Sequence, residues 1–149
     1  MQARPPADRG RGKGHVVGVG VATKDWEGYF PIRHEGGGNL DEDMVLRWLK
    51  NTLSSTRRDV VFHNALYDVG WLRREGVLVK GKILDTIIAA PLLNENRFSY
   101  SLDNLGVEYC DERKDESLLK SAALAFGINP KSEMYKLHAK YVGPYGQQD

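Results

Sequence analysis

The sequence predicts a mixed α/β fold in a single domain. A β-branched run at residues 15–23 is typical of a strand, and a second apolar run at 60–62 ends in a polar turn. Between them, apolar residues of segment 40–54 recur at helical spacing. A chain of 149 residues with 41% hydrophobic content is long enough to build one such core.

Composition excludes several classes of protein. The formal net charge is +1, so no overall basic field favours nucleic acid, and any such contact must be local. The single cysteine, Cys110, excludes an internal disulfide and a multi-cysteine zinc site, and the four histidines lack zinc-ligand spacing. No apolar run approaches the roughly 20 residues of a membrane helix, and no secretion signal opens the chain. We therefore expect a cytoplasmic location and no membrane partner.

The first third of the chain predicts an arm, a hairpin and a helix. Residues 1–14 are rich in arginine, glycine and proline, which predicts a disordered basic arm. Residues 15–23 and 29–34 predict a hairpin, and Pro31 predicts that its second strand lies at a sheet edge. His34 is expected at the surface or at the strand end. Asn39 or Asp41 can cap the helix at about 40–54. The face of this helix expected on the sheet comprises Met44, Val45, Trp48, Leu49 and Leu53.

The middle of the chain alternates strand and helix. Asp59 opens the strand that ends at residue 62, and the helix that follows is expected to stop near Gly76. A turn and a short strand at 78–84 lead to Asp85 and Thr86, which can cap a helix through residue 93. We therefore expect Asp85 to be a structural hydrogen-bond acceptor.

The C-terminal part is predicted to be helical. Ser101 caps residues 102–105, and a helix at 116–126 is closed by Gly127. The residues of that helix expected to face inward are Leu118, Leu119, Ala122 and Ala123. Pro144 is predicted in the first turn of a last helix, on which Tyr145 and Asp149 share a face because they are four residues apart.

The candidate site lies where the strand at 60–62 ends. Asn64, Tyr67 and Asp68 follow it directly, and this edge of an α/β sheet is where ligands usually bind. If the last helix faces the same cleft, Tyr145 and Asp149 join them. A phenol beside carboxylates suits activation of water next to a hard divalent metal.

These motifs resemble the proofreading 3′–5′ exonuclease domain of family A DNA polymerases, especially those of bacteriophages. The resemblance runs from about His15 to Asp149 and rests on Phe62-His63-Asn64-Ala65-Leu66-Tyr67-Asp68, then Leu84-Asp85-Thr86, then Tyr145-x-x-x-Asp149. It implies a ribonuclease H-like mixed sheet flanked by helices, in which the hairpin supplies the second and third strands.

The resemblance also implies roles for the site residues. Asp68 and Asp149 would bind metal and Tyr145 would orient the attacking water, whereas Asn64 and Tyr67 would contact the terminal nucleotides. The implied cofactors are two Mg²⁺ or Mn²⁺ ions. The implied partners are the 3′ end of single-stranded DNA and a polymerase domain in the same parent chain.

One part of the family pattern has no counterpart. The first motif, Asp-x-Glu on the first strand, should precede the hairpin, but residues 1–14 contain no Asp-x-Glu and predict no strand. We therefore expect a partial exonuclease domain at 15–149, truncated at both ends, with its first strand missing, weak metal binding and impaired hydrolysis.

Two other functions stay open. One is a ribonuclease D-like or Werner-like exonuclease of the same fold, which acts on RNA or damaged ends. The other is a non-catalytic domain that binds single strands or supports a neighbouring polymerase. The cleavage products of labelled DNA and RNA distinguish them.

Overall fold

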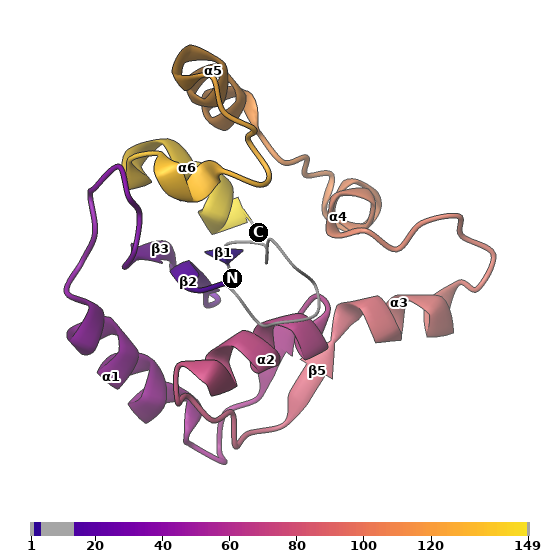
Figure 1. Cartoon of the computed structure of the whole chain (residues 1–149). Coiled ribbons are helices and arrows are strands. Elements are labelled where there is room, and N and C mark those ends of the chain that lie inside the picture. Colours follow the sequence, from indigo (N-terminus) through magenta and orange to yellow (C-terminus); the bar gives the residue numbers. More distant parts are fainter. Residues whose placement is uncertain (1, 4–13, 149) are drawn as a thin grey trace. The chain divides into compact units, whose positions relative to one another are not determined.

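The computed structural model describes residues 2–3 and 14–148, and these form two compact units (Figure 1). One unit, here called the terminal unit, comprises Met1–Val45 and Lys114–Asp149. The other, here called the middle unit, is Leu46–Arg113. Helix α1 (Glu42–Leu53) spans the boundary between them.

The sheet of the terminal unit is antiparallel, with strands in the order β1, β2, β3. Strand β2 (Val16–Ala22) pairs with β3 (Glu27–Pro31), which confirms the hairpin and the edge position predicted from Pro31. Val16 and Val17 are both almost fully buried, so β2 is covered on both faces. The β-branched run thus forms the centre of this sheet.

A short strand before the hairpin departs from expectation. Gln2 pairs with Gly18 and Ala3 with Val16, forming β1 (Gln2–Ala3) antiparallel to β2. The expectation that no strand precedes His15 is therefore not confirmed. Strand pairing uses backbone donors and acceptors, so a two-residue strand needs no apolar pattern that a sequence could reveal. The rest of the expected arm, residues 4–13, lies outside the described residues.

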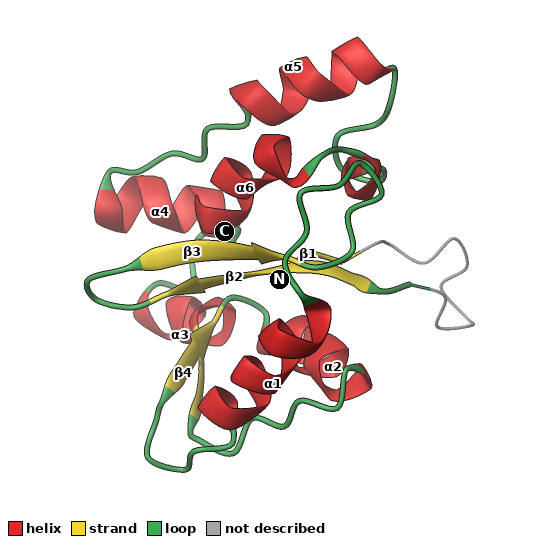
Figure 2. Cartoon of the chain, turned by 90° about the vertical axis from the view of Figure 1, so that its left-hand side faces the viewer, coloured by secondary structure: helices red, strands yellow, loops and turns green. Residues whose placement is uncertain are grey.

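Helices cover the hairpin in the terminal unit. Helix α5 (Ser117–Phe126), the 3₁₀ turn η1 (Met134–Lys136) and α6 (Ala139–Gln148) follow one another, and α6 lies along β3 (Figure 2). Gly127 ends α5 with φ +64, as its position predicted. The buried cluster between these elements comprises Leu119, Ala122, Met134, Leu137 and Val142.

Helix α6 begins earlier than predicted. Pro144 lies inside the helix and not in its first turn, which starts at Ala139. His138 organises that turn, because its carbonyl accepts from Tyr141 N at 3.0 Å and its Nδ1 accepts from Lys140 N at 3.1 Å. Residues 139–143 have no apolar periodicity, and histidine is not among the residues whose presence predicts a helix cap.

The middle unit contains two strands that pair in parallel. Val60 of β4 (Val60–Phe62) pairs with Ile83 of β5 (Ile83–Asp85), and Phe62 with Asp85. Helix α2 (Ala65–Arg74) follows β4, α3 (Thr86–Leu93) follows β5, and α4 (Leu102–Cys110) comes next. The carboxyl ends of the two strands therefore meet, and each leads directly into a helix.

Most helix boundaries agree with the predictions, whereas the buried faces predicted for α1 and α5 differ from those observed. Asp41 caps α1 and Ser101 caps α4, but α4 runs five residues past the predicted end at Leu105. Met44 and Trp48 are exposed, so the apolar face predicted for α1 is narrower and centres on Val45 and Leu49. Leu118 of α5 is also exposed, contrary to the inward position predicted for it.

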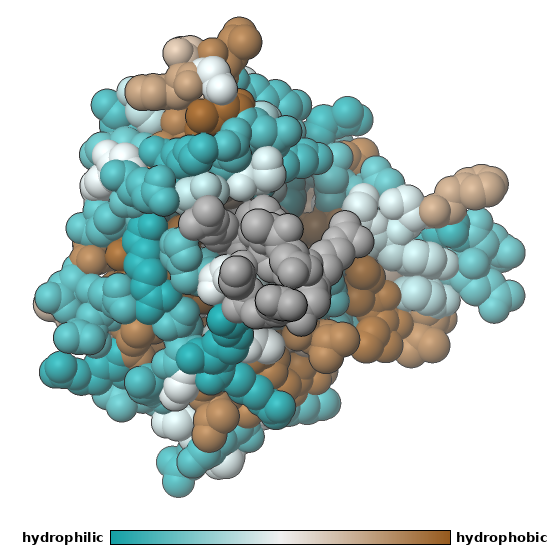
Figure 3. All heavy atoms as spheres, viewed as in Figure 1, coloured by the Kyte–Doolittle hydropathy of each residue, from teal (hydrophilic) through white to brown (hydrophobic). Residues whose placement is uncertain are grey.

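Helix α3 carries an exposed apolar surface. Ile88, Leu92 and Leu93 are 66%, 84% and 75% exposed, and brown side chains gather around α3 in Figure 3. Of the helices described, none is long and apolar enough to cross a bilayer.

Candidate functional site

The carboxylate of Asp85 joins the starts of two helices. It accepts hydrogen bonds from Asn64 N at 2.9 Å and Ala65 N at 2.8 Å, where α2 begins, and from Ile87 N at 3.1 Å, where α3 begins. Desolvation raises the pKa of Asp85, but the three backbone donors outweigh it and hold the pKa below its usual value. The prediction that Asp85 is a structural hydrogen-bond acceptor is confirmed. The hydrogen bonds that it accepts from the start of α2 were not predicted.

A second bridge connects the same strand ends. The Thr86 hydroxyl donates to Phe62 O at 3.1 Å and lies 2.9 Å from Nδ1 of His63. Because Phe62 and Asp85 are direct partners in the parallel pair, the residues that follow them face each other. Asp85, Thr86 and His63 together fix the turn that leads into α2.

Asn64 shapes that turn through its backbone. It has left-handed geometry, φ 72 and ψ 59, which asparagine tolerates better than most residues. Its carbonyl accepts from Tyr67 N at 3.0 Å, whereas its side chain makes no capping hydrogen bond and is exposed. The amide group therefore points out from a backbone that is held in place.

Tyr67 and Asp68 occupy the first turn of α2. The Tyr67 ring is 45% exposed and meets the buried Trp71 ring edge-on, with 6.2 Å between centroids. Burial raises the pKa of the Tyr67 phenol, Trp71 opposes this, and the charge of Asp68 raises the pKa further. The phenol thus stays a hydrogen-bond donor at neutral pH. Asp68 is half-buried beside it.

The described carboxylates do not make up a two-metal site. Divalent ions of the magnesium type bind through several oxygen ligands. Asp85 accepts three backbone hydrogen bonds, and the other carboxylate predicted at this edge is the half-buried Asp68. Across residues 2–3 and 14–148, no three side chains of His, Cys, Asp or Glu are grouped to hold a metal. Asp149, the second predicted ligand, lies outside the described residues.

Tyr145 belongs to the terminal unit. Its half-buried ring packs against the buried cluster of that unit, and Nζ of Lys114 lies 5.5 Å from the ring centroid. Part of the ring therefore contributes to packing. Its convergence with Asp68 of the middle unit stays a prediction.

A match to a family model decides what kind of domain this is. The model described as 3′–5′ exonuclease matches residues 14–141, which include the hairpin, Asn64, Tyr67 and Asp68. The chain belongs to the 3′–5′ exonuclease family. The matched range ends before Tyr145, so the third predicted motif rests on the chain's own sequence.

Relatives of this exonuclease domain are DNA polymerases. A DNA-directed DNA polymerase of Pseudomonas phage M6 is 38% identical over 97% of this chain, and a DNA polymerase DpoZ of Salmonella phage PMBT28 is 35% identical over 74% of it. DNA polymerase I of Pseudomonas aeruginosa is 27% identical over 90%. The chain spans 22%, 17% and 15% of the lengths of these three proteins.

One buried polar cluster of the exonuclease domain was not predicted from the sequence. His34 is 3% exposed and not at the surface. Its Nε2 accepts from the Tyr29 hydroxyl at 2.7 Å, and its Nδ1 donates to Leu137 O at 3.1 Å. Burial raises the pKa of the Tyr29 phenol. His34 thereby joins the end of β3 to the segment that precedes α6. A histidine three residues past a strand carries no sequence signal for such a long-range contact.

Proposed function

We propose that this domain removes nucleotides from the 3′ end of single-stranded DNA, in the service of a polymerase domain in the same parent chain. The observation that carries the proposal is the turn between β4 and α2, where Asn64 and Tyr67 expose polar groups next to Asp68. The Asp85 carboxylate holds the backbone of this turn in place by accepting hydrogen bonds from Asn64 N and Ala65 N, and a fixed turn suits recognition of a chain end.

In this proposal the exposed groups bind the substrate. The Asn64 amide and the Tyr67 hydroxyl would donate to phosphate or sugar oxygens of the terminal nucleotides. Asp68 would serve as a carboxylate of the reaction centre, with Asp149 as its partner and Tyr145 orienting the attacking water. The names of the relatives favour DNA over RNA as the substrate.

Hydrolysis by this chain is proposed to be weak. The family chemistry requires divalent Mg²⁺ or Mn²⁺, and Asp68 alone at the strand edge would supply too little negative charge to hold two such ions closely. Residues 1–14 contain no Asp-x-Glu to add to it. The proposed setting is the cytoplasm, where replicating DNA lies.

Product analysis tests this proposal. The protein is incubated with 5′-labelled single-stranded DNA, and separately with RNA, in Mn²⁺ and in Mg²⁺. We expect a slow one-nucleotide ladder from DNA. Cleavage of RNA alone would support the ribonuclease-like alternative, and a mobility shift without products would support the non-catalytic one.

A further inference from the structure

The middle unit contains a cleft that the proposed exonuclease site does not use. It has a volume of about 460 Å³ and lies between segment 97–99 and α4. Polar and apolar groups line it, and those that matter here are Arg97, Phe98, Asp103, Asn104, Glu108 and Arg113. Its volume lies within the range of small-ligand sites, roughly 300–1,000 Å³.

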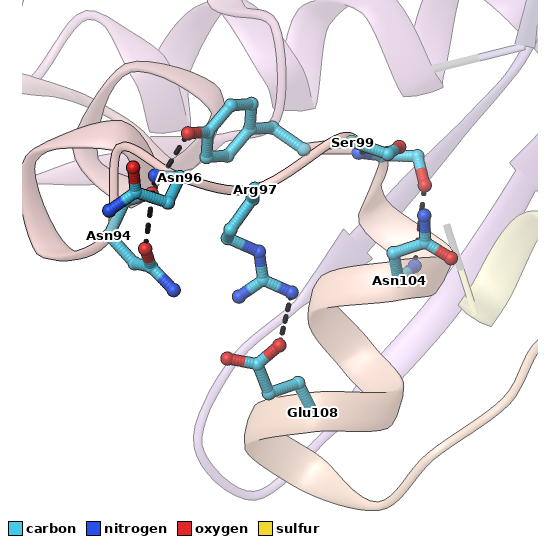
Figure 4. Close-up of polar contacts among 8 residues, drawn as sticks. Asn94, Asn96, Arg97, Ser99, Asn104 and Glu108 are labelled. Carbon is cyan, nitrogen blue, oxygen red and sulfur yellow. Dashed lines mark hydrogen bonds and ion pairs between the residues drawn. The ribbon is translucent and has the colours of Figure 1, made fainter.

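Arg97 presents a buried hydrogen-bond donor for which the described part of the chain supplies no acceptor. One guanidinium nitrogen, Nη2, pairs with Glu108 of α4, as Figure 4 shows, and the guanidinium lies 5.6 Å from the Tyr109 ring centroid. The other nitrogen, Nη1, is buried and has no hydrogen-bond partner among the described residues. The side chain as a whole is only 11% exposed. A buried donor without a partner is costly, so a ligand that brings an acceptor oxygen or nitrogen is favoured there.

The charges of the cleft favour a neutral ligand. Arg97 and Arg113 are balanced by Asp103 and Glu108, so the lining has no net charge. A phosphate group would meet two carboxylates as well as two guanidinium groups. A ligand with both acceptors and donors matches this lining better, because it can use the carboxylates as well as the arginines.

Phe98 adds a stacking surface. Its side chain is fully exposed, at 108% of the reference area, at the edge of the same cleft. An unburied phenylalanine beside polar groups is the arrangement with which proteins bind unpaired bases, since a base stacks on the ring and its edge forms hydrogen bonds.

We propose that this cleft binds one unpaired nucleobase of the single-stranded substrate. The inference rests on the proposed function, which supplies a single strand as the ligand. The base stacks on Phe98. Its acceptor atoms accept hydrogen bonds from the Arg97 guanidinium, and its donor atoms donate hydrogen bonds to the carboxylates of the cleft.

Binding of single-stranded DNA pentamers in EDTA tests the proposal. One pentamer is intact, and five others each carry one abasic position. We expect Arg97→Ala and Phe98→Ala to weaken binding of the intact pentamer by about 5- to 100-fold, the range measured when a stacked base loses its platform. The pentamer that lacks the base bound in the cleft should bind the wild type and both variants equally, because it has no base to contact Arg97 or Phe98. Arg57→Ala, an exposed arginine of the same unit outside the cleft, is the matched control and should bind as the wild type does.

Each outcome decides the matter. If Arg97→Ala weakens every abasic pentamer equally and lowers the salt dependence, the contact is with phosphate and the base proposal is overturned. If neither variant weakens binding, the cleft does not bind the strand. If the wild type binds none of the pentamers, the proposed function fails as well. Because Phe98 is fully exposed, its replacement leaves the fold intact and decides the question even if Arg97→Ala unfolds.

Discussion

Asp85 shows how one side chain can support a site without belonging to it. Its three backbone hydrogen bonds fix the starts of α2 and α3. We predict that Asp85→Ala lowers the free energy of unfolding by about 1–3 kcal/mol, because a cap and two further charge-assisted bonds are lost. Urea unfolding measures this. The exposed Asp59→Ala should change stability by less than about 0.5 kcal/mol. Equal effects of the two replacements would contradict the structural role.

Asn64 allows backbone and side-chain roles to be separated. Its left-handed φ suits glycine, whereas alanine there is strained by about 1–2 kcal/mol. We therefore predict that Asn64→Ala destabilises the domain more than Asn64→Gly does. Both should weaken binding of single-stranded DNA by the same factor, since both remove the amide. Wild-type affinity in the glycine variant would show that Asn64 only closes the turn.

His34 predicts a pH dependence of stability. Burial lowers its pKa from the usual 6.5, the Leu137 carbonyl opposes this, and His138 lowers it further. The unfolded chain then binds a proton more readily than the folded one, so stability is full above about pH 6.5 and declines as the pH falls toward the folded pKa.

Thermal unfolding of His34→Gln between pH 7.5 and 5 tests this prediction. Glutamine can keep one bond to Tyr29 or Leu137 but carries no titrating ring. The difference in stability between wild type and variant should therefore shrink as the pH falls below 6.5. A difference that stays constant with pH would contradict the account.

At the scale of elements, α6 packs closely against the hairpin because Gly20 and Gly146 have no side chains at the contact. A Cβ at Gly146 would lie 2.6 Å from a Tyr29 ring carbon, and one at Gly20 would meet the Gly146 carbonyl. We predict that Gly146→Ala destabilises the terminal unit by about 1–3 kcal/mol through this overlap. Gly143→Ala in the same helix is the matched control, since its Cβ has Tyr29 only at 3.9 Å. It should be neutral or stabilising because alanine favours helix. Thermal unfolding compares them, and a stabilising Gly146→Ala would contradict the packing described.

Elements whose signals are local could be predicted, and those that depend on distant partners could not. The hairpin, the cap at Ser101 and the end of α5 at Gly127 all follow from neighbouring residues. The start of α6 depends on His138, and strand β1 exists only through pairing with β2. The exposure of Trp48 likewise reflects tertiary packing and not helical spacing.

For the whole molecule, the order of the three exonuclease-like motifs along the chain predicted the family better than any single motif did. The segment Asn64 to Asp68 and the capping carboxylate of Asp85 were predictable because both lie where a strand leads into a helix. The cleft around Arg97 was not, because it arises from an irregular segment that folds onto α4. Nor could sequence spacing alone reveal that Tyr145 shares in the packing of a buried cluster.

The most direct test of the account is the exonuclease rate of a longer version that carries an Asp-x-Glu strand before Val16. The rate at which this longer version shortens 5′-labelled single-stranded DNA in Mn²⁺ is compared with the rate of the 149-residue chain. The account predicts a rise of at least about 100-fold, and loss of this gain in Asp68→Asn without loss of stability. Equal rates with and without the added strand, or a gain that does not depend on Asp68, would contradict it.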